Sequence, residues 1–254
     1  MLFYFSGTGN SKYVARKIAQ NLDDRMISIS DCLKKQELVF TVGDDERIGF
    51  VFPTYFYGVP SIVADFTERL KLNNCQHQYF YAITTCGKEC GNLFAEFRKL
   101  LTGRGFKLDG VAEVALPDNY ILLFNLLPNK DIRQNMFVAA DKHMAVLTDQ
   151  IRDRRLPAVK SDLGRFLKTQ FSYPMYKYGR STRHFYATNA CNGCRLCAES
   201  CPIDIITIDH DKPRWQRGRC VQCLACLHRC PQKAIQHKKR TEKRDRYTNP
   251  META

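Results

Sequence analysis

Eight of the twelve cysteines lie between Cys191 and Cys230, and their spacing constrains the fold more than any other feature of the sequence. The run Cys191-x2-Cys194-x2-Cys197-x3-Cys201-Pro202 recurs 29 residues later as Cys220-x2-Cys223-x2-Cys226-x3-Cys230-Pro231. The chain starts MLFYF, which has no basic lead-in and too short an apolar run for a secretion signal. In a chain without such a signal, a dense cysteine block indicates bound metal rather than disulfide bonds.

The repeated run is typical of two [4Fe–4S] clusters. Three cysteines at three-residue spacing surround one face of a cluster, and the fourth cysteine of each run ligates the other cluster. We therefore predict two ligand sets, the first made of Cys191, Cys194, Cys197 and Cys230 and the second of Cys201, Cys220, Cys223 and Cys226. Zinc is the alternative, but zinc ribbons use two separated CxxC pairs and need no third cysteine or Cys-Pro ending.

The first 154 residues alternate between strand and helix patterns. Strands are predicted over Met1–Phe5, Met26–Ile29, Arg47–Phe52, Tyr79–Thr84 and Val111–Leu116, and helices over Ser11–Leu22, Pro60–Leu70, Gly91–Leu101 and Asp131–Arg154. This alternation implies a parallel sheet with helices on both faces. Ligands of such sheets bind beyond the carboxyl ends of the strands. The loops to consider are therefore Ser6–Ser11, Pro53–Val59, Thr85–Asn92 and Pro117–Tyr120.

The first of these loops, SGTGNS, has the composition of a phosphate-binding turn. Backbone N–H groups at a helix N-terminus bind phosphate without a charged side chain. Polar side chains add donors and two glycines allow close approach; these residues are Ser6, Gly7, Thr8, Gly9, Asn10 and Ser11. The GxxxxGK[ST] pattern is absent, and Lys12 stands where a dinucleotide loop has glycine. We expect a pocket for one terminal phosphate, with a plain strand–helix turn as the alternative.

The next two loops suit a flat ring system. Tyr55, Phe56 and Tyr57 bring aromatic faces to the sheet edge, although ordinary packing would also explain them. Gly87 and Gly91 permit a backbone approach to a ring edge. Cys86 and Cys90 could form a redox pair in the same loop, but a reducing cytoplasm favours free thiols.

Together these loops resemble the flavodoxin family over about the first 150 residues. The resemblance implies a doubly wound α/β sheet of order 2-1-3-4-5 and a bound FMN, with Tyr55 and Tyr57 flanking its isoalloxazine ring. The cofactor-binding residues that it implies, beyond the phosphate loop, are Thr54, Tyr55, Phe56, Tyr57, Gly58, Thr85, Cys86, Gly87, Gly91, Asn92, Asn119 and Tyr120.

The cysteine block is similar to bacterial-type ferredoxins with two [4Fe–4S] clusters, a small α+β fold with strands expected at Ile203–Ile208 and Ala234–His237. The two halves together resemble the flavodoxin–ferredoxin fusion proteins of anaerobic bacteria and archaea. We expect a flavodoxin-like domain over 1–154, a packed aromatic and basic connector over 155–187, a ferredoxin domain over 188–238 and a basic, disordered tail over 239–254.

Charge is distributed unevenly and bears on the partners. Residues 1–150 hold 17 basic and 17 acidic side chains, so the whole net charge of +13 comes from residues 151–254. This asymmetry favours redox partners that are acidic at the contact face. The segment HKKRTEKRDR suggests nucleic acid, but such runs are usually solvated tails, so no nucleic-acid partner is expected. No apolar stretch could span a bilayer, and a cytoplasmic location is expected.

Two functions remain open from the sequence. The first is an electron-transfer protein that passes electrons between the two clusters and FMN and links one- and two-electron partners. The alternative is an FMN-dependent reductase of a small organic substrate that receives its electrons through the clusters. A reductase needs a proton donor beside the flavin, and the sequence places His77 and Asp118 only loosely.

Overall fold

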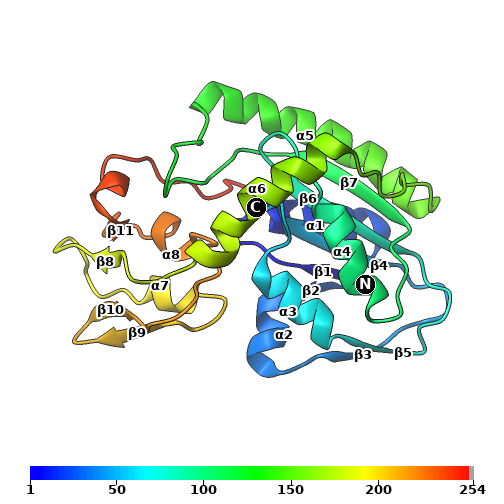
Figure 1. The fold of residues 1–254 in the computed structure, drawn as a ribbon, viewed down its shortest axis with the longest axis horizontal. Coiled ribbons are helices and arrows are strands. Elements are labelled where there is room, and N and C mark those ends of the chain that lie inside the picture. The colour runs from blue at the N-terminus through cyan, green and yellow to red at the C-terminus, as the bar shows by residue number, and fades with distance from the viewer. Residues whose placement is uncertain (252–254) are drawn as a thin grey trace.

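A five-stranded parallel sheet forms the core of the N-terminal part of the molecule (Figure 1). The computed structural model describes residues 1–251. The strands are β1 Leu2–Tyr4, β2 Met26–Ser28, β4 Ile48–Pro53, β6 Phe80–Cys86 and β7 Gly110–Ala115, and the sheet order is β2-β1-β4-β6-β7. Numbered by their order along the chain within this sheet, the strands follow 2-1-3-4-5, which confirms the predicted flavodoxin-like topology.

Apolar side chains cover both faces of the sheet, as expected for strands buried on each side. Phe3 and Phe50 contribute to one core, together with α2 Ile29–Lys35, α3 Ser61–Arg69 and α4 Leu93–Thr102. Their chain neighbours Leu2 and Val51 contribute to the other core, under α1 Asn10–Leu22 and α5 Lys130–Arg152. The alternation of side chains along each strand therefore produces two cores, one on each face of the sheet.

Three short elements of this part lie outside the predicted pattern. Helix α2 has only seven residues and is capped by Ser28, whose Oγ accepts a 3.3 Å hydrogen bond from the Asp31 amide. The strands β3 Val39–Thr41 and β5 Lys71–Asn73 pair in parallel with each other, apart from the main sheet. Each of these strands has three residues, which is too short for a periodic pattern to identify it.

The cysteine block folds as a small unit with two antiparallel strand pairs. Strand β8 (Phe185–Ala187) pairs with β11 (Ile235–His237), and β9 (Ile206–Asp209) pairs with β10 (Lys212–Trp215). The short helices α7 (Leu196–Glu199) and α8 (Ala225–His228) lie inside the two cysteine runs. Strands β9 and β11 fall in the two segments where the spacing predicts strands, with β9 shifted toward the C-terminus.

The connector contains a helix, α6 Leu163–Gly179, which crosses the front of the molecule between the two parts (Figure 1). It begins at Asp162, whose side chain accepts a 2.9 Å hydrogen bond from the Arg165 amide, and it contains Pro174. The Tyr176 hydroxyl accepts from the Ser61 amide and donates to the Val221 carbonyl, both at 3.0 Å. The connector therefore contacts the sheet domain and the cysteine block at the same time.

The C-terminal segment differs from the disordered tail expected over 239–254. Residues 239–251 begin with the 3₁₀ turn Lys239–Thr241, and Tyr247 and Asn249 are 4% and 3% exposed. Two of its basic side chains, Arg244 and Arg246, bind protein carbonyls and order the segment: Arg244 Nη1 donates to the Ile121 oxygen at 2.6 Å. Residues 252–254 lie outside the described residues. No helix within residues 1–251 has the length and apolar character needed to cross a membrane.

Candidate functional site

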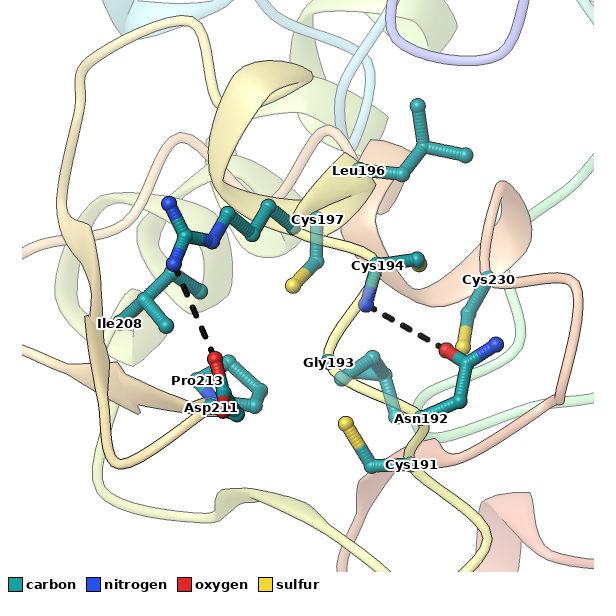
Figure 2. Close-up of a pocket in the computed structure, with 12 residues that line it drawn as sticks. Cys191, Asn192, Gly193, Cys194, Leu196, Cys197, Ile208, Asp211, Pro213 and Cys230 are labelled. Carbon is teal, nitrogen blue, oxygen red and sulfur yellow. Dashed lines mark hydrogen bonds and ion pairs between the residues drawn. The ribbon is translucent and has the colours of Figure 1, made fainter.

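The first predicted cysteine set lines a single pocket. Figure 2 shows the four cysteines around it, together with Gly193, Ile208 and Pro213. Three of the cysteines come from the first run and Cys230 comes from the second, as the cross-ligation pattern predicts. Cys194 is exposed to solvent. We call Cys191, Cys194, Cys197 and Cys230 the outer cysteine set.

The second predicted set lies deeper, and its members lie close enough together to influence each other's charge. Burial raises the pKa of the Cys226 thiol, and the nearby thiols of the three other members raise it further. Burial likewise raises the pKa of Cys220 to about 11. A cluster bound here would take these cysteines as thiolates, so their protons would leave on binding. We call Cys201, Cys220, Cys223 and Cys226 the inner cysteine set.

The backbone of the two cysteine runs repeats along with the sequence. The left-handed residues Gly193 (φ 75°) and Arg195 (φ 65°) recur 29 positions later as Gln222 (φ 55°) and Leu224 (φ 59°). The amides of Gln222 and Ala234 donate to the sulfurs of Cys220 and Cys230 at 3.2 and 3.3 Å. Soft sulfur donors that accept amide hydrogen bonds are the environment of an iron–sulfur cluster. Within residues 1–251, no three Cys, His, Asp or Glu side chains are grouped to hold a single metal ion.

The four predicted loops meet at the carboxyl edge of the main sheet. Ser11 Oγ and Thr85 Oγ1 are 2.7 Å apart, which joins the first loop to the third. The Asn10 amide nitrogen donates to the Pro117 oxygen at 3.0 Å, and Asn119 donates to the Thr8 hydroxyl, which join the first loop to the fourth. The Thr54 amide donates to the Thr85 carbonyl at 3.0 Å, which joins the second loop to the third, so all four loops are connected at this edge.

The phosphate loop leaves the start of α1 open to an anion. Gly9 precedes the helix at φ 101°, a left-handed conformation that suits glycine, and no described side chain caps the helix. The first backbone N–H groups of a helix have no intrahelical acceptor and form its positive end. Thr54 Oγ1, in the neighbouring loop, is buried and has no hydrogen-bond partner among the described residues. The uncapped amides of α1 and the unpaired Thr54 hydroxyl both fit a phosphorylated flavin.

The aromatic loop is a tight turn with strained residues at its centre. Tyr55 and Gly58 exchange two backbone hydrogen bonds of 3.0 Å. Phe56 (φ 51°) and Tyr57 (φ 64°) lie between them in left-handed conformations, which cost free energy for bulky residues. The Phe56 ring packs edge-on against Tyr120 at 5.1 Å between ring centroids. The turn therefore fixes these aromatic side chains relative to the fourth loop.

Some of the predicted flavin contacts face other neighbours. The Asn92 backbone N–H donates to Thr169 at 2.8 Å and its side-chain oxygen accepts from Ser161 at 2.7 Å, so both of these groups bind the connector. A Cβ atom on Gly91 would lie 2.7 Å from the Thr169 hydroxyl. Burial and the Glu113 carboxylate raise the pKa of the Cys86 and Cys90 thiols, which keeps both protonated.

Sequence reasoning missed several residues that border this edge. From α6, the Tyr173 hydroxyl donates to the Val59 carbonyl at 2.6 Å, and the Tyr176 ring lies 5.5 Å from that of Tyr55. The sequence feature that pointed to these tyrosines was the aromatic composition of the connector. Arg229 and the C-terminal segment also contact the phosphate loop. The polar sequence of that segment does not predict a buried position.

The inner cysteine set lies directly against the phosphate loop. A Cβ atom on Gly7 would come within 2.3 Å of the Cys223 carbonyl oxygen, so only glycine fits there. Arg229 Nε donates to the Gly7 carbonyl at 3.2 Å. Val221, Cys223 and Ala225 belong to the same apolar core as Phe5, with Tyr55 packed against it. One continuous core thus spans the sheet domain and the inner set.

Comparison with known families agrees with this division. The flavodoxin domain family model matches residues 1–102, and the 4Fe-4S dicluster domain model matches residues 190–235. The chain matches a flavodoxin–ferredoxin fusion. The two domains identify an electron-transfer flavo-iron–sulfur protein, since one family binds FMN and the other binds iron–sulfur clusters.

Two solved structures are similar to the fusion at low identity. The Trp repressor binding protein from Bacillus subtilis is 13% identical, with a TM-score of 0.36, over 63% of this chain and 100% of that chain. The rubredoxin oxygen:oxidoreductase from the anaerobe Desulfovibrio gigas is 16% identical, with a TM-score of 0.33, over 59% of this chain and 36% of that chain. No curated protein matches the sequence.

Proposed function

We propose that the fusion carries single electrons between an outer [4Fe–4S] cluster, an inner [4Fe–4S] cluster and FMN held on the four loops. The observation that carries this proposal is the contact between the inner cysteine set and the phosphate loop, where Cys223 packs on Gly7. Because bound FMN accepts one or two electrons, such a chain links one-electron partners to two-electron chemistry. Flow in either direction is compatible with this arrangement.

Burial supports the order of the two clusters. Cys223 and Cys226 are 8% and 9% exposed, and Cys223 lies in the core that continues into the sheet domain. Cys194 of the outer set is exposed, on the side where a partner can approach. Electron tunnelling becomes steeply slower with distance, so a partner exchanges electrons best with the cluster nearest the surface. The inner cluster then lies between that cluster and the flavin.

This assignment predicts the flavin, iron and sulfide content of the purified protein. The protein purified without oxygen should hold one FMN, eight irons and eight sulfides, because each [4Fe–4S] cluster contributes four of each. Metal analysis, acid-labile sulfide determination and chromatography of the released flavin measure the three quantities. Stoichiometric zinc, or FAD in place of FMN, would contradict the assignment.

A cationic groove beside the outer set is the proposed docking place for an acidic partner. It lies between β8 and β10, and its described lining residues include Arg183, Lys212, Arg214 and Arg217 but none that is acidic. The stacked rings of Phe185 and Trp215, 5.8 Å apart, also border it. The groove shares Pro213 with the outer pocket, and Lys212 Nζ donates to the Cys191 carbonyl at 2.7 Å. An acidic protein in this groove would bring its own redox centre close to the outer cluster.

If this groove steers the partner, association should depend on salt. Exposed charges are screened within about 8 Å at physiological ionic strength, so the association rate with an acidic two-cluster ferredoxin should fall as salt rises. Arg183→Gln with Arg217→Gln should lower the rate at low salt by about tenfold and flatten its salt dependence. Arg98→Gln with Lys99→Gln, a matched charge change on α4, should leave the rate nearly unchanged. A rate indifferent to salt would refute a docking role for the groove.

One observation favours the reductase as a second candidate. Burial raises the pKa of the Asp118 carboxyl, whose Oδ1 accepts a 2.9 Å hydrogen bond from the Tyr120 amide. Asp118 packs on Gly87 of the third loop, where an added Cβ would lie 2.9 Å from the Asp118 Cβ. A carboxyl that retains its proton at higher pH can serve as a proton donor. Anaerobic reoxidation of the reduced flavin by a small molecule, rather than by a protein alone, would distinguish the reductase.

A further inference from the structure

The C-terminal segment runs from the dicluster domain to the phosphate loop and contacts it. The Asn249 backbone N–H donates to the Thr8 carbonyl at 2.8 Å. The Tyr247 hydroxyl and the Asn249 side-chain amide both donate to Asn10 Oδ1, at 2.7 and 3.1 Å. Both residues are almost fully buried. These bonds connect residues that are more than 230 positions apart in sequence.

The C-terminal segment is also hydrogen-bonded to the dicluster domain. The Tyr247 amide donates to His228 Nδ1 at 3.1 Å, and His228 Nε2 lies 2.8 Å from the Asn119 carbonyl. Since Nδ1 accepts, Nε2 carries the proton and donates. His228 is the last residue of α8, so the segment is anchored to the helix of the second cysteine run.

Hydrogen bonds to the loop carbonyls also fix the direction of the loop N–H groups. In a planar trans peptide the carbonyl and the following N–H point in opposite directions. Asn249 holds the Thr8 carbonyl outward and Arg229 holds the Gly7 carbonyl outward. The Gly9 N–H therefore points away from the C-terminal segment and reaches Ser6 Oγ at 3.1 Å, and the Thr8 N–H points away from Arg229. Amides directed inward, with carbonyls outside, form an anion-binding nest.

The start of α1 is fixed in the same way. Asn10 is the first residue of the helix, and its side-chain oxygen accepts both tail donors. Its side-chain nitrogen donates to the Pro117 carbonyl at 3.0 Å on the other side. The Asn10 amide group is thus oriented from two directions. Without the tail donors, a buried acceptor oxygen would lose its partners, which costs stability at the point where the helix amides face the anion.

We propose that Tyr247 and Asn249 are positioning residues of the flavin phosphate site, so that the C-terminal segment keeps the loop in the conformation that binds a phosphate monoester. This rests on the proposed FMN function. Both side chains act through Asn10, the Asn249 backbone N–H also acts on Thr8, and the ring is held by the other loops. Their contribution is therefore specific to the phosphate group of the ligand.

The test compares two ligands that differ only in the phosphate. Riboflavin and FMN are titrated anaerobically into flavin-free, cluster-loaded protein, and flavin fluorescence reports the dissociation constants. Tyr247→Phe with Asn249→Ala should weaken FMN binding by about tenfold or more, the size expected for losing a buried hydrogen bond, and should leave riboflavin binding unchanged. Tyr178→Phe on exposed α6 and Thr248→Ala beside Asn249 are the matched controls, with no change expected.

A double-mutant cycle tests whether Tyr247 acts through Asn10. Asn10→Ala removes the acceptor, so adding Tyr247→Phe to it should cause no further loss of FMN affinity. Equal losses of FMN and riboflavin affinity would show general support of the fold and overturn the proposal, as would unchanged affinities. If the double variant does not retain its iron, Tyr247→Phe alone, which removes one oxygen atom, decides the question. Failure of the unaltered protein to bind FMN would instead refute the proposed FMN function.

Discussion

Replacing Cys201 with serine should remove the cluster nearest the flavin, although Cys201 belongs to the first cysteine run. The reason is the repeat spacing, which assigns the fourth cysteine of the first run to the cluster built on Cys220, Cys223 and Cys226. The outer pocket is lined by Cys230 as its fourth cysteine, so it should keep its cluster in this variant. The iron content should fall by about half, from two clusters to one.

Electron paramagnetic resonance of the reduced protein identifies which cluster is lost. The matched variant Cys230→Ser should remove the outer cluster and leave the inner one. Cys32→Ser, at a buried thiol in the core of the sheet domain, should leave both in place. If Cys201→Ser destroyed the cluster on Cys191, Cys194 and Cys197 and spared the other, the cross-ligation assignment would be wrong.

The main sheet and the grouping of the outer cysteines around one pocket could be predicted because their signals are local. The strand predicted at Arg47–Phe52 is apolar after its first residue and is followed by a proline and a helix pattern, so its type and burial follow from a few residues. The pairing of Cys230 with the outer set crosses the two runs, yet the repeat spacing alone predicts it. Local periodicity, however, says nothing about which cluster faces the sheet domain.

The seam between the domains could not be predicted, because it depends on contacts far apart in sequence. Gly7 and Cys223 meet through packing of two separately folded units, and no pattern in either loop encodes the other. Helix α6 was hidden by its Pro174 and by exposed apolar residues such as Phe171, at 76% exposure, which blur the amphipathic period. The aromatic composition of the connector indicated packing but did not identify Tyr176 as the shared contact.

The C-terminal segment shows the limit of reasoning from charge. Its basic residues predict a solvated tail, because isolated Lys and Arg side chains are normally hydrated. In the structure, Arg244 and Arg246 bind backbone carbonyls, including those of Ile121 and Ile235. A guanidinium that satisfies several carbonyls at once can order a polar segment, and only the folded arrangement of those carbonyls reveals it.

The central claim is that electrons reach the flavin through the two clusters, and rapid mixing tests it most directly. Cys194→Ser with Cys223→Ser removes one ligand from each set, while serine preserves the size of the Cys223 side chain packed on Gly7. This variant should still bind FMN, which equilibrium titration confirms before the kinetic comparison. Cys32→Ser again serves as the control.

Reduced ferredoxin is mixed anaerobically with each protein, and flavin absorbance is followed with time. On the proposed pathway the outer cluster would receive the electron and the inner cluster would pass it on to FMN. Flavin reduction should therefore be at least about tenfold slower in the cluster-free variant, a barrier increase of about 1.4 kcal/mol or more. Equal rates in the two proteins would show that the clusters do not feed the flavin and would contradict the proposed pathway.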